Sequence, residues 1–317
     1  MKRISLLLIE ICLFSAFLFF YGCIGEDDLE DDYDAVVAGF IEDIRADNLE
    51  QYVNWMQDYD SRFFLNDNRR EIAVDIKNKF VGMGYSDTRI DSFYMSAEWD
   101  GENYNTWQYN VVARLEGSSL NENICVMGAH YDCIVDEGDP FEYAPGANDN
   151  ASGLAAVIEV ARVLKKEGFS PRNTIEFVAF AAEEYELNGS ARYAQNASSE
   201  DMNIIMMLNN DMISYAEDSE SSWMVNVMDY DNSSALRSDF VACGERYTEL
   251  NFSHDNRYNK EGDSYSFYEE DFEALFIISD EEDDYYHTAN DKAKNCNFEY
   301  CREVAALSCA FLIQENN

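Results

Sequence analysis

Hydrophobic residues recur along the chain in two patterns that predict different elements. From residue 33 to about 81, apolar side chains lie three or four positions apart, the spacing of amphipathic helices, and the segment GMG at 82–84 then ends this helical region. Short alternating or continuously apolar runs, typical of β-strands, follow at residues 109–115, 124–127, 174–180, 204–208, 224–228 and 274–278. Helical periodicity returns at residues 151–166, 234–248 and 298–312.

The alternation of strands with helices predicts an α/β fold with a mostly parallel central β-sheet and helices on both of its faces. The chain shows no internal repeat and no linker that would divide it, so we expect a single domain. In sheets of this type, ligands bind at the carboxyl ends of the strands. Side chains directly after the predicted strands are therefore the first candidates for a functional site.

The first 34 residues differ in character from the rest of the chain. Lys2 and Arg3 precede an apolar run over residues 4–21, which is typical of an export signal. The sequence YGC at 21–23, followed by acidic residues, resembles a prokaryotic lipoprotein signal in which the cysteine is lipidated, although Phe20 stands where a smaller residue is usual. We therefore expect a lipoprotein-type signal peptide at 1–22, an acidic tether at 23–34 and the folded domain at 35–317.

Two alternatives remain open for this amino-terminal segment: an uncleaved membrane anchor, since the apolar run is near the lower length limit for spanning, and plain secretion. All three interpretations place the folded domain outside the cytoplasm. The main expectation is that the protein is exported and anchored to the outer face of the cell membrane. In that case, its only contact with the membrane is a lipid attached to Cys23.

Composition excludes some partners without identifying one. The 317 residues carry a net charge of -41, which excludes nucleic acids and anionic membranes as electrostatic partners. We interpret the charge as a solvated acidic surface suited to high salt, where screening reduces self-repulsion. A hydrophobic content of 47% and an aromatic content of 14% exclude a disordered chain. The sequence does not indicate an oligomeric state.

Six cysteines lie beyond the amino-terminal segment: Cys125, Cys133, Cys243, Cys296, Cys301 and Cys309. An exported location permits disulfides, and a bridge between Cys125 and Cys133 would brace the segment between them. The spacing of the cysteines contains no CxxC pair, so a cysteine-based zinc site is not expected.

Five short segments, far apart in the sequence, each carry a residue that can bind a metal ion. They are GAHYD (128–132), PGANDN (145–150), AEE (182–184), NND (209–211) and YHT (286–288). Two of the chain's three histidines lie in these segments, and most of the segments follow a predicted strand. Because neighbouring strand ends meet at one edge of a parallel sheet, we expect the segments to converge there.

Two imidazoles and three carboxylates suit a pair of zinc ions bridged by one carboxylate. In the arrangement that gives each ion three protein ligands, His130 and Asp211 bind one ion, His287 and Glu184 bind the other, and Asp149 bridges them. Two divalent cations, three carboxylates and one hydroxide leave the site nearly neutral, which avoids the cost of isolated buried charge.

Two further carboxylates complete the hypothesis. Adjacent carboxylates at a strand end point to different sides, so Glu183 is the candidate general base beside the metal-bound water, while Glu184 is the ligand. Asp132 lies two residues beyond His130 and is the candidate acceptor for the second ring N–H of that histidine.

The series GAHYD, PGANDNASG, FAAEE, NNDM and YHTANDK resembles peptidase family M28, the zinc aminopeptidases, over nearly all of the predicted mature chain, including the segment SRF at 61–63. The resemblance implies that two zinc ions are bound and that Glu183 is the base; cobalt or manganese can occupy such a site. The ligands it implies are His130, Asp149, Glu184, Asp211 and His287. Asp263 and Phe267 fit a further loop motif of the family, but Gly262 stands where serine is usual.

The resulting hypothesis is an exopeptidase, most readily an aminopeptidase that releases amino-terminal residues from peptides by attack of a zinc-bridging hydroxide. A carboxypeptidase would need a cation for the terminal carboxylate, and Arg257 or Lys260 are the candidates. A one-zinc glutaminyl cyclase and a non-catalytic surface binding protein are two further candidate functions. His254 lies outside the motifs and is interpreted as a loop histidine. The preferred amino-acid side chain cannot be derived from these patterns.

Overall fold

The computed structural model describes residues 26–120, 122–216 and 223–316. The predicted signal peptide at 1–22 and the lipidation candidate Cys23 lie outside the described residues, so both stay predictions. Part of the predicted tether lies in helix α1 (Glu26–Ile41). The chain divides into two compact units, Met1–Val36 and Val37–Asn317, and the second contains the β-sheet. No helix in the described part of the chain has the length and hydropathy needed to cross a membrane.

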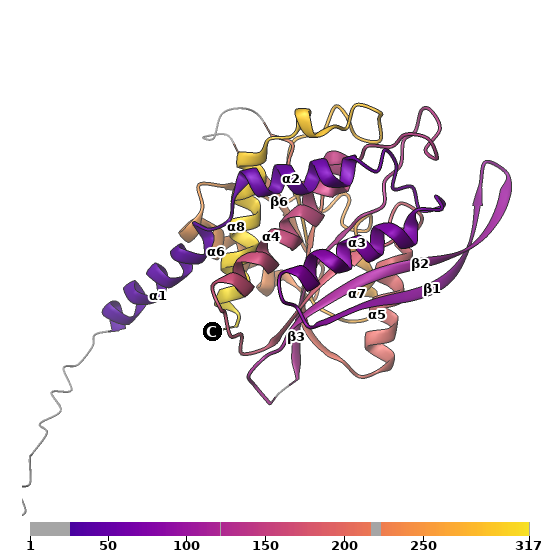
Figure 1. Cartoon of the computed structure of the whole chain (residues 1–317). Helices are drawn as coiled ribbons and strands as arrows, with labels where there is room; N and C mark the ends of the chain where they lie inside the picture. The colour runs from indigo at the N-terminus through magenta and orange to yellow at the C-terminus, as the bar shows by residue number, and fades with distance from the viewer. Residues whose placement is uncertain (1–25, 121, 217–222, 317) are drawn as a thin grey trace, which may run out of the picture. The chain divides into compact units, whose positions relative to one another are not determined.

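Among the described residues, eight strands form one sheet in the order β1-β2-β4-β3-β5-β8-β6-β7 (Figure 1). They are β1 (Asp87–Trp99), β2 (Glu102–Leu115), β3 (Asn123–His130), β4 (Thr174–Phe180), β5 (Asn203–Asn210), β6 (Met224–Met228), β7 (Asn251–Ser253) and β8 (Ala274–Ser279). Strands β4, β3, β5 and β8 run parallel to one another at the centre of the sheet. Strands β1 and β2 and strand β6 add antiparallel pairs on either side. The predicted α/β class with a mostly parallel sheet is therefore confirmed.

The predicted helical region at 33–81 is divided into α1, α2 (Ala46–Gln57) and α3 (Arg69–Gly82). The later helices are α4 (Gly153–Lys166), α5 (Asn188–Ser199), α6 (Ser234–Tyr247), α7 (Asp263–Glu269) and α8 (Phe298–Gln314). Of these, α4, α6 and α8 lie where the periodicity predicts them, whereas α5 and α7 have no counterpart in the expected pattern.

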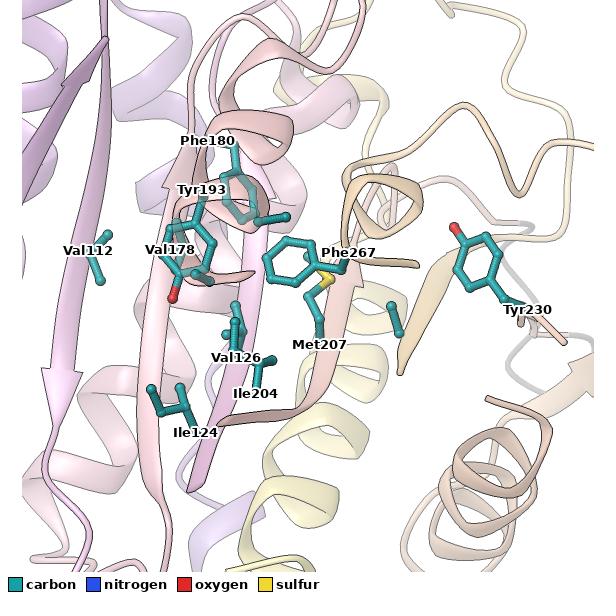
Figure 2. Packing of buried hydrophobic residues seen from close by; sticks show 13 residues of the cluster. Val112, Ile124, Val126, Val178, Phe180, Tyr193, Ile204, Met207, Tyr230 and Phe267 are labelled. Carbon is teal, nitrogen blue, oxygen red and sulfur yellow. The ribbon is translucent and has the colours of Figure 1, made fainter. Parts of the chain in front are cut away.

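Alternate side chains of β4 show that helices cover both faces of the sheet. Phe177 packs edge-on against Tyr85, whose hydroxyl donates to a carbonyl of α4 at 2.8 Å. Phe180 lies in the same strand three positions later and therefore points to the opposite face. There it meets Tyr193 of α5 and Phe267 of α7, with ring centroids 6.0 Å away in each case (Figure 2).

The cluster in Figure 2 fixes the strands that carry the candidate site. Val126 of β3, Val178 of β4 and Met207 of β5 are buried side by side with the aromatic rings above them. The ring of Phe180 lies against Gly128, where an added Cβ would come within 2.4 Å of it. Only glycine allows this close approach. The contact packs β3 tightly against β4 immediately before the carboxyl ends of both strands.

Strands β1 and β2 form a long hairpin, of which the sequence pattern predicted only residues 109–115. Its turn is Asp100-Gly101, with φ of 50° and 77°, the positive values that a two-residue hairpin turn needs. Phe93 lies on the buried face of this hairpin, in one cluster with Phe64 and Tyr185. Tyr185 stacks on Phe64 at 5.0 Å and follows Glu184 directly in the chain, so the hairpin supports the loop that carries two candidate site residues.

The bridge between Cys125 and Cys133 that an exported location would permit is not formed, and both residues have free thiols. The Sγ atom of Cys133 donates to the carbonyl of Ala144 at 2.9 Å and accepts the N–H of Arg62 at 3.3 Å. Cys125 is buried in β3 beside Asn316. Packing and hydrogen bonds therefore brace the first metal segment in place of a disulfide.

Candidate metal centre

The five sequence segments converge at the carboxyl ends of the four parallel strands. His130 is the last residue of β3, and Asp211 directly follows β5. Glu183 follows β4 after two alanines, and His287 lies in the loop after β8. These strands are neighbours in the order β4-β3-β5-β8, so the sheet itself brings the segments together.

Two groups of possible ligand atoms share one carboxylate. In the first group, the Nε2 atom of His130 lies 3.2 Å from Oδ1 of Asp149 and 3.4 Å from Oδ1 of Asp211. In the second, the Nε2 atom of His287 lies 3.2 Å from Oδ2 of Asp149 and 3.0 Å from Oε2 of Glu184. The ligand atoms within each group all lie within 4.8 Å of one another. Because Asp149 presents a different oxygen to each group, its geometry is that of a bridging ligand.

Several of the candidate ligand atoms lack hydrogen-bond partners within the protein, and a bound metal ion would satisfy them. Oε1 of Glu184, Oδ1 of Asp211 and Nε2 of His287 are buried and make no hydrogen bond of good geometry with the described residues. Buried polar atoms without partners are costly, and a cation at these positions would satisfy all three. Imidazole nitrogens and carboxylate oxygens are also the ligands that zinc accepts in catalytic sites.

Asp132 contacts both a candidate ligand and the loop after β4. The Nδ1 atom of His130 lies 3.2 Å from the Asp132 carbonyl oxygen and 3.6 Å from its carboxylate. This arrangement keeps the proton on Nδ1 and leaves Nε2 free for a metal. The same carboxylate accepts the main-chain N–H groups of Glu183 at 3.1 Å and Glu184 at 3.2 Å. The structure therefore places Asp132 beside His130, with its main-chain carbonyl as the nearer acceptor for the ring N–H, and adds contacts that the sequence does not reveal.

The turn that presents Asp149 depends on its glycine. Gly146 has a φ of 50°, and a Cβ at this position would lie 2.4 Å from Cβ of Cys133 and 2.5 Å from the carbonyl oxygen of Asp149. The peptide bond between Asp149 and Asn150 is cis. The side chain of Asn150 accepts the N–H of Met212 at 3.2 Å, which attaches the turn to the segment carrying Asp211.

Arg62 is a structural residue of the site to which the sequence motifs assign no role. It is buried, and its guanidinium donates to the carbonyls of Tyr131 at 2.7 Å, Pro145 at 2.8 Å and Gly146 at 2.6 Å. These carbonyls belong to the two segments that carry His130 and Asp149. One planar guanidinium thus fixes the spacing of both segments, which the compact ammonium of a lysine cannot do with the same geometry.

Burial and mutual charge shift the pKa values of the candidate ligands. Burial, with the charge of Asp149, raises the pKa of Glu184 to about 8. Burial also opposes ionisation of Asp149, but its contacts with His130 and His287 outweigh this effect and hold its pKa below the usual range. For His287, burial lowers the pKa, but the contacts with Asp149 and Glu184 outweigh it and raise the value to about 11. The clustered carboxylates therefore favour the binding of cations at this site.

The pKa of Glu183 suits a group that takes up a proton. Burial raises it well above the usual range, and the charge of Asp263 adds to this effect, while His130 opposes it. Asp263 is itself buried, and neither of its carboxylate oxygens has a hydrogen-bond partner among the described residues. Burial raises the pKa of Asp263 to about 7.

The structure explains why glycine occupies position 262. An added Cβ would lie 2.8 Å from the side-chain nitrogen of Asn209 and 2.9 Å from the ring of Phe276. A serine at this position would therefore collide with strands β5 and β8. The departure from the expected motif is a local packing feature at the start of α7.

Strained backbone surrounds the ligands. Ala182, Met212 and His287 have positive φ values of 55°, 50° and 52° although none is glycine. Ala182 precedes Glu183, Met212 follows Asp211, and His287 is itself a candidate ligand. Such conformations cost about 1–3 kcal/mol each and persist where surrounding contacts enforce them, which is common at functional sites.

The remaining candidates from the sequence lie elsewhere. His254 pairs with Asp229 at 2.7 Å, in agreement with its interpretation as a loop histidine. Arg257 is exposed and pairs with Asp255, and Lys260 lies over the ring of Tyr265. Among the described residues, neither cation forms an ion pair with the candidate ligands.

The fold and the site together define a class of protein: an α/β protein in which two groups of possible metal ligands share one carboxylate. The sequence model of peptidase family M28 matches residues 110–312. The chain therefore belongs to peptidase family M28.

Named relatives agree with this assignment. A probable zinc metalloprotease of Leptosphaeria maculans is 43% identical over 105 residues, which cover 33% of this chain and 24% of that protein. A probable leucine aminopeptidase of Trichophyton verrucosum is 26% identical over 291 residues, covering 88% of this chain and 73% of that one. The crystal structure of the LapA aminopeptidase of Legionella pneumophila superposes with a TM-score of 0.74 at 25% identity, covering 89% of this chain and 75% of that chain.

This chain matches only part of the length of several curated relatives. The chain spans only 34%, 24% and 20% of the length of three of the curated relatives that it matches. The comparisons therefore establish the family and the fold of this chain.

Proposed function

We propose that this protein is a zinc-dependent aminopeptidase that releases amino-terminal residues from peptides. The observation that carries the proposal is the pair of ligand groups sharing Asp149, with the carboxylate of Glu183 beside them. The proposal is supported by similarity to a probable leucine aminopeptidase and to an aminopeptidase of known structure.

Two zinc ions would be held by the two groups, one by His130 and Asp211, the other by Glu184 and His287, with Asp149 shared. Zinc bound there supplies Lewis acidity toward the scissile carbonyl and lowers the pKa of bound water to about 7. Zinc is favoured because the ligand set is nitrogen and oxygen and because a relative is named a zinc metalloprotease.

Glu183 is the residue that we expect to move protons. Its Oε2 atom lies 3.8 Å from Nε2 of His130, next to the ligand group and outside it. Its main-chain N–H donates to Asp132, which orients Glu183 and leaves the Glu183 carboxylate free for proton transfer. With a raised pKa, it can take the proton of the attacking water and deliver it to the leaving amine.

The charges around the site favour a substrate with a free amine over one with a free carboxylate. Among the described residues, the ion pairs of the ligand carboxylates are all with histidines, and none involves a lysine or arginine. Asp136 adds a further carboxylate, 3.5 Å from Nδ1 of His287. A carboxypeptidase would need a guanidinium or ammonium group for the substrate's terminal carboxylate.

We expect the purified, zinc-loaded protein to hydrolyse leucine amide and to lose this activity in the presence of a chelator. Acetylation of the substrate amine should reduce kcat/KM by at least about 100-fold, since loss of a charged contact in a low-dielectric site costs several kcal/mol. The measurement is release of ammonia, the product that leucine amide and its acetylated form have in common. Faster cleavage of an amino-blocked dipeptide would instead indicate a carboxypeptidase, and cyclisation of an amino-terminal glutamine a cyclase.

A further inference from the structure

Three consecutive main-chain N–H groups in the turn that carries the bridging ligand donate to one residue. Ala147 donates to the carbonyl oxygen of Asp291 at 3.1 Å. Asn148 donates to Oδ1 of Asp291 at 2.7 Å, and Asp149 donates to Oδ2 at 3.0 Å. Asp291 is only 3% exposed, so solvent does not compete for these bonds. One residue thus accepts three successive main-chain N–H groups of the turn, two through its carboxylate and one through its carbonyl.

Asp132 makes the same kind of contact on another segment of the site. Its two carboxylate oxygens accept the N–H groups of the adjacent residues Glu183 and Glu184. In both cases, a buried carboxylate binds two successive amides in a segment that carries a candidate ligand. Charge-assisted hydrogen bonds of this type are stronger and more directional than neutral ones.

We infer that Asp291 is a positioning residue for the bridging carboxylate of Asp149; this rests on the proposed function, in which Asp149 is shared by two metal ions. Asp291 acts through the main chain of the turn, since its carboxylate accepts main-chain N–H groups. It is four residues beyond His287 in the same loop. We call these three hydrogen bonds from residues 147–149 to Asp291 the clamp. Because Asp291 and His287 share a loop, the clamp fixes the distance between Asp149 and His287.

The loop that carries the clamp is held at further points. The carbonyl of His287 accepts the N–H of Asp136 at 2.9 Å. The side chain of Asn148 donates to Asp283 at 2.7 Å and accepts the hydroxyl of Ser214 at 2.8 Å. Displacement of the Asp149 turn therefore requires the loss of the Asp291 bonds in addition to those of Asn148.

The clamp requires a carboxylate. An asparagine has the same shape but offers only one acceptor, and its amide nitrogen would face the N–H of either Asn148 or Asp149. One of the two N–H groups would then be buried without a partner, and the turn would shift to relieve it. The position of Asp149, and with it metal affinity, would change.

The test is zinc affinity in D291N, measured by competition with a chromogenic chelator on the folded, metal-free protein. Substitutions of outer groups that orient metal ligands typically reduce metal affinity about 10–100-fold, and we expect D291N to raise the Kd of at least one zinc ion within this range. The matched control is D239N, which removes the same charge from an exposed position of α6. Thermal unfolding of the metal-free proteins shows whether the fold is retained.

D291E extends the test if D291N does not fold. It keeps both acceptors but moves them by one methylene, so a several-fold rise in Kd is expected. Wild-type zinc affinity in either folded variant would overturn the inference. A wild-type protein that binds two zinc ions without hydrolysing any substrate would contradict the proposed function and leave the clamp measurement valid. A wild-type protein that binds no zinc would overturn both.

Discussion

Replacement of Glu183 by glutamine is expected to abolish most turnover while both zinc ions stay bound. The glutamine side chain has nearly the same shape, and its main-chain N–H still donates to Asp132. It cannot accept a proton from the attacking water or return one to the leaving amine. Loss of a general base typically costs about 10²–10⁴-fold, so we expect kcat to fall by about 10³-fold with little change in KM.

The control for this experiment is E186Q, three residues further along the same loop. Glu186 is exposed, so neutralising it removes a nearby charge without touching the ligand groups. Activity within twofold of wild type in E186Q, together with unchanged zinc content in E183Q, would isolate the proton-transfer role. Activity of E183Q within tenfold of wild type would reject the assignment of Glu183 as base.

Replacement of Asp149 by asparagine is expected to affect both metal ions at once. Each oxygen of this carboxylate faces a different histidine, at 3.2 Å in both cases. An asparagine keeps one oxygen, and its amide nitrogen has no lone pair for a metal. We expect a loss of activity of more than about 10³-fold, because both the water-activating and carbonyl-polarising roles depend on the paired ions.

The comparison that sharpens this result is D211N, because Asp211 belongs to only one of the two groups. In metal analysis after dialysis against limiting zinc, we expect D149N to retain less than about one zinc per chain and D211N to retain about one. Equal retention by the two variants would contradict the shared role of Asp149. Both variants should keep the fold, which circular dichroism can check.

The sequence predicts the centre of the fold better than its edges. Residues 174–180 are apolar throughout except for Thr174 and Glu176, because β4 is buried on both faces, and this pattern coincides with the strand as observed. Strand β1 is half exposed, so its alternation through Phe93 and Met95 is a weaker signal, although Asp100-Gly101 marks the turn. Helix α5 is rich in small and polar residues and carries few large apolar side chains, so its sequence resembles that of a loop. Its place is set by packing of Tyr193 against the sheet.

The candidate site, like the fold, could be predicted only in part from the sequence. The candidate ligands can be found because a metal demands particular side chains after particular strands, and the structure brings these residues together. Arg62 and Asp291 lie in the quoted segments SRF and YHTANDK, but they bind main-chain carbonyls and N–H groups, and such partners have no sequence signature. Their roles depend on which loops become neighbours, and only the folded chain shows this. The free thiol of Cys133 is a similar case, since its hydrogen-bond partners are main-chain groups.

The most direct test of this account is a crystal structure of the zinc-loaded protein with anomalous scattering measured at the zinc edge. The account predicts two zinc peaks about 3.5–4 Å apart, one beside His130 and Asp211, the other beside His287 and Glu184, with one oxygen of Asp149 on each. A single peak, or two ions that do not share Asp149, would contradict it.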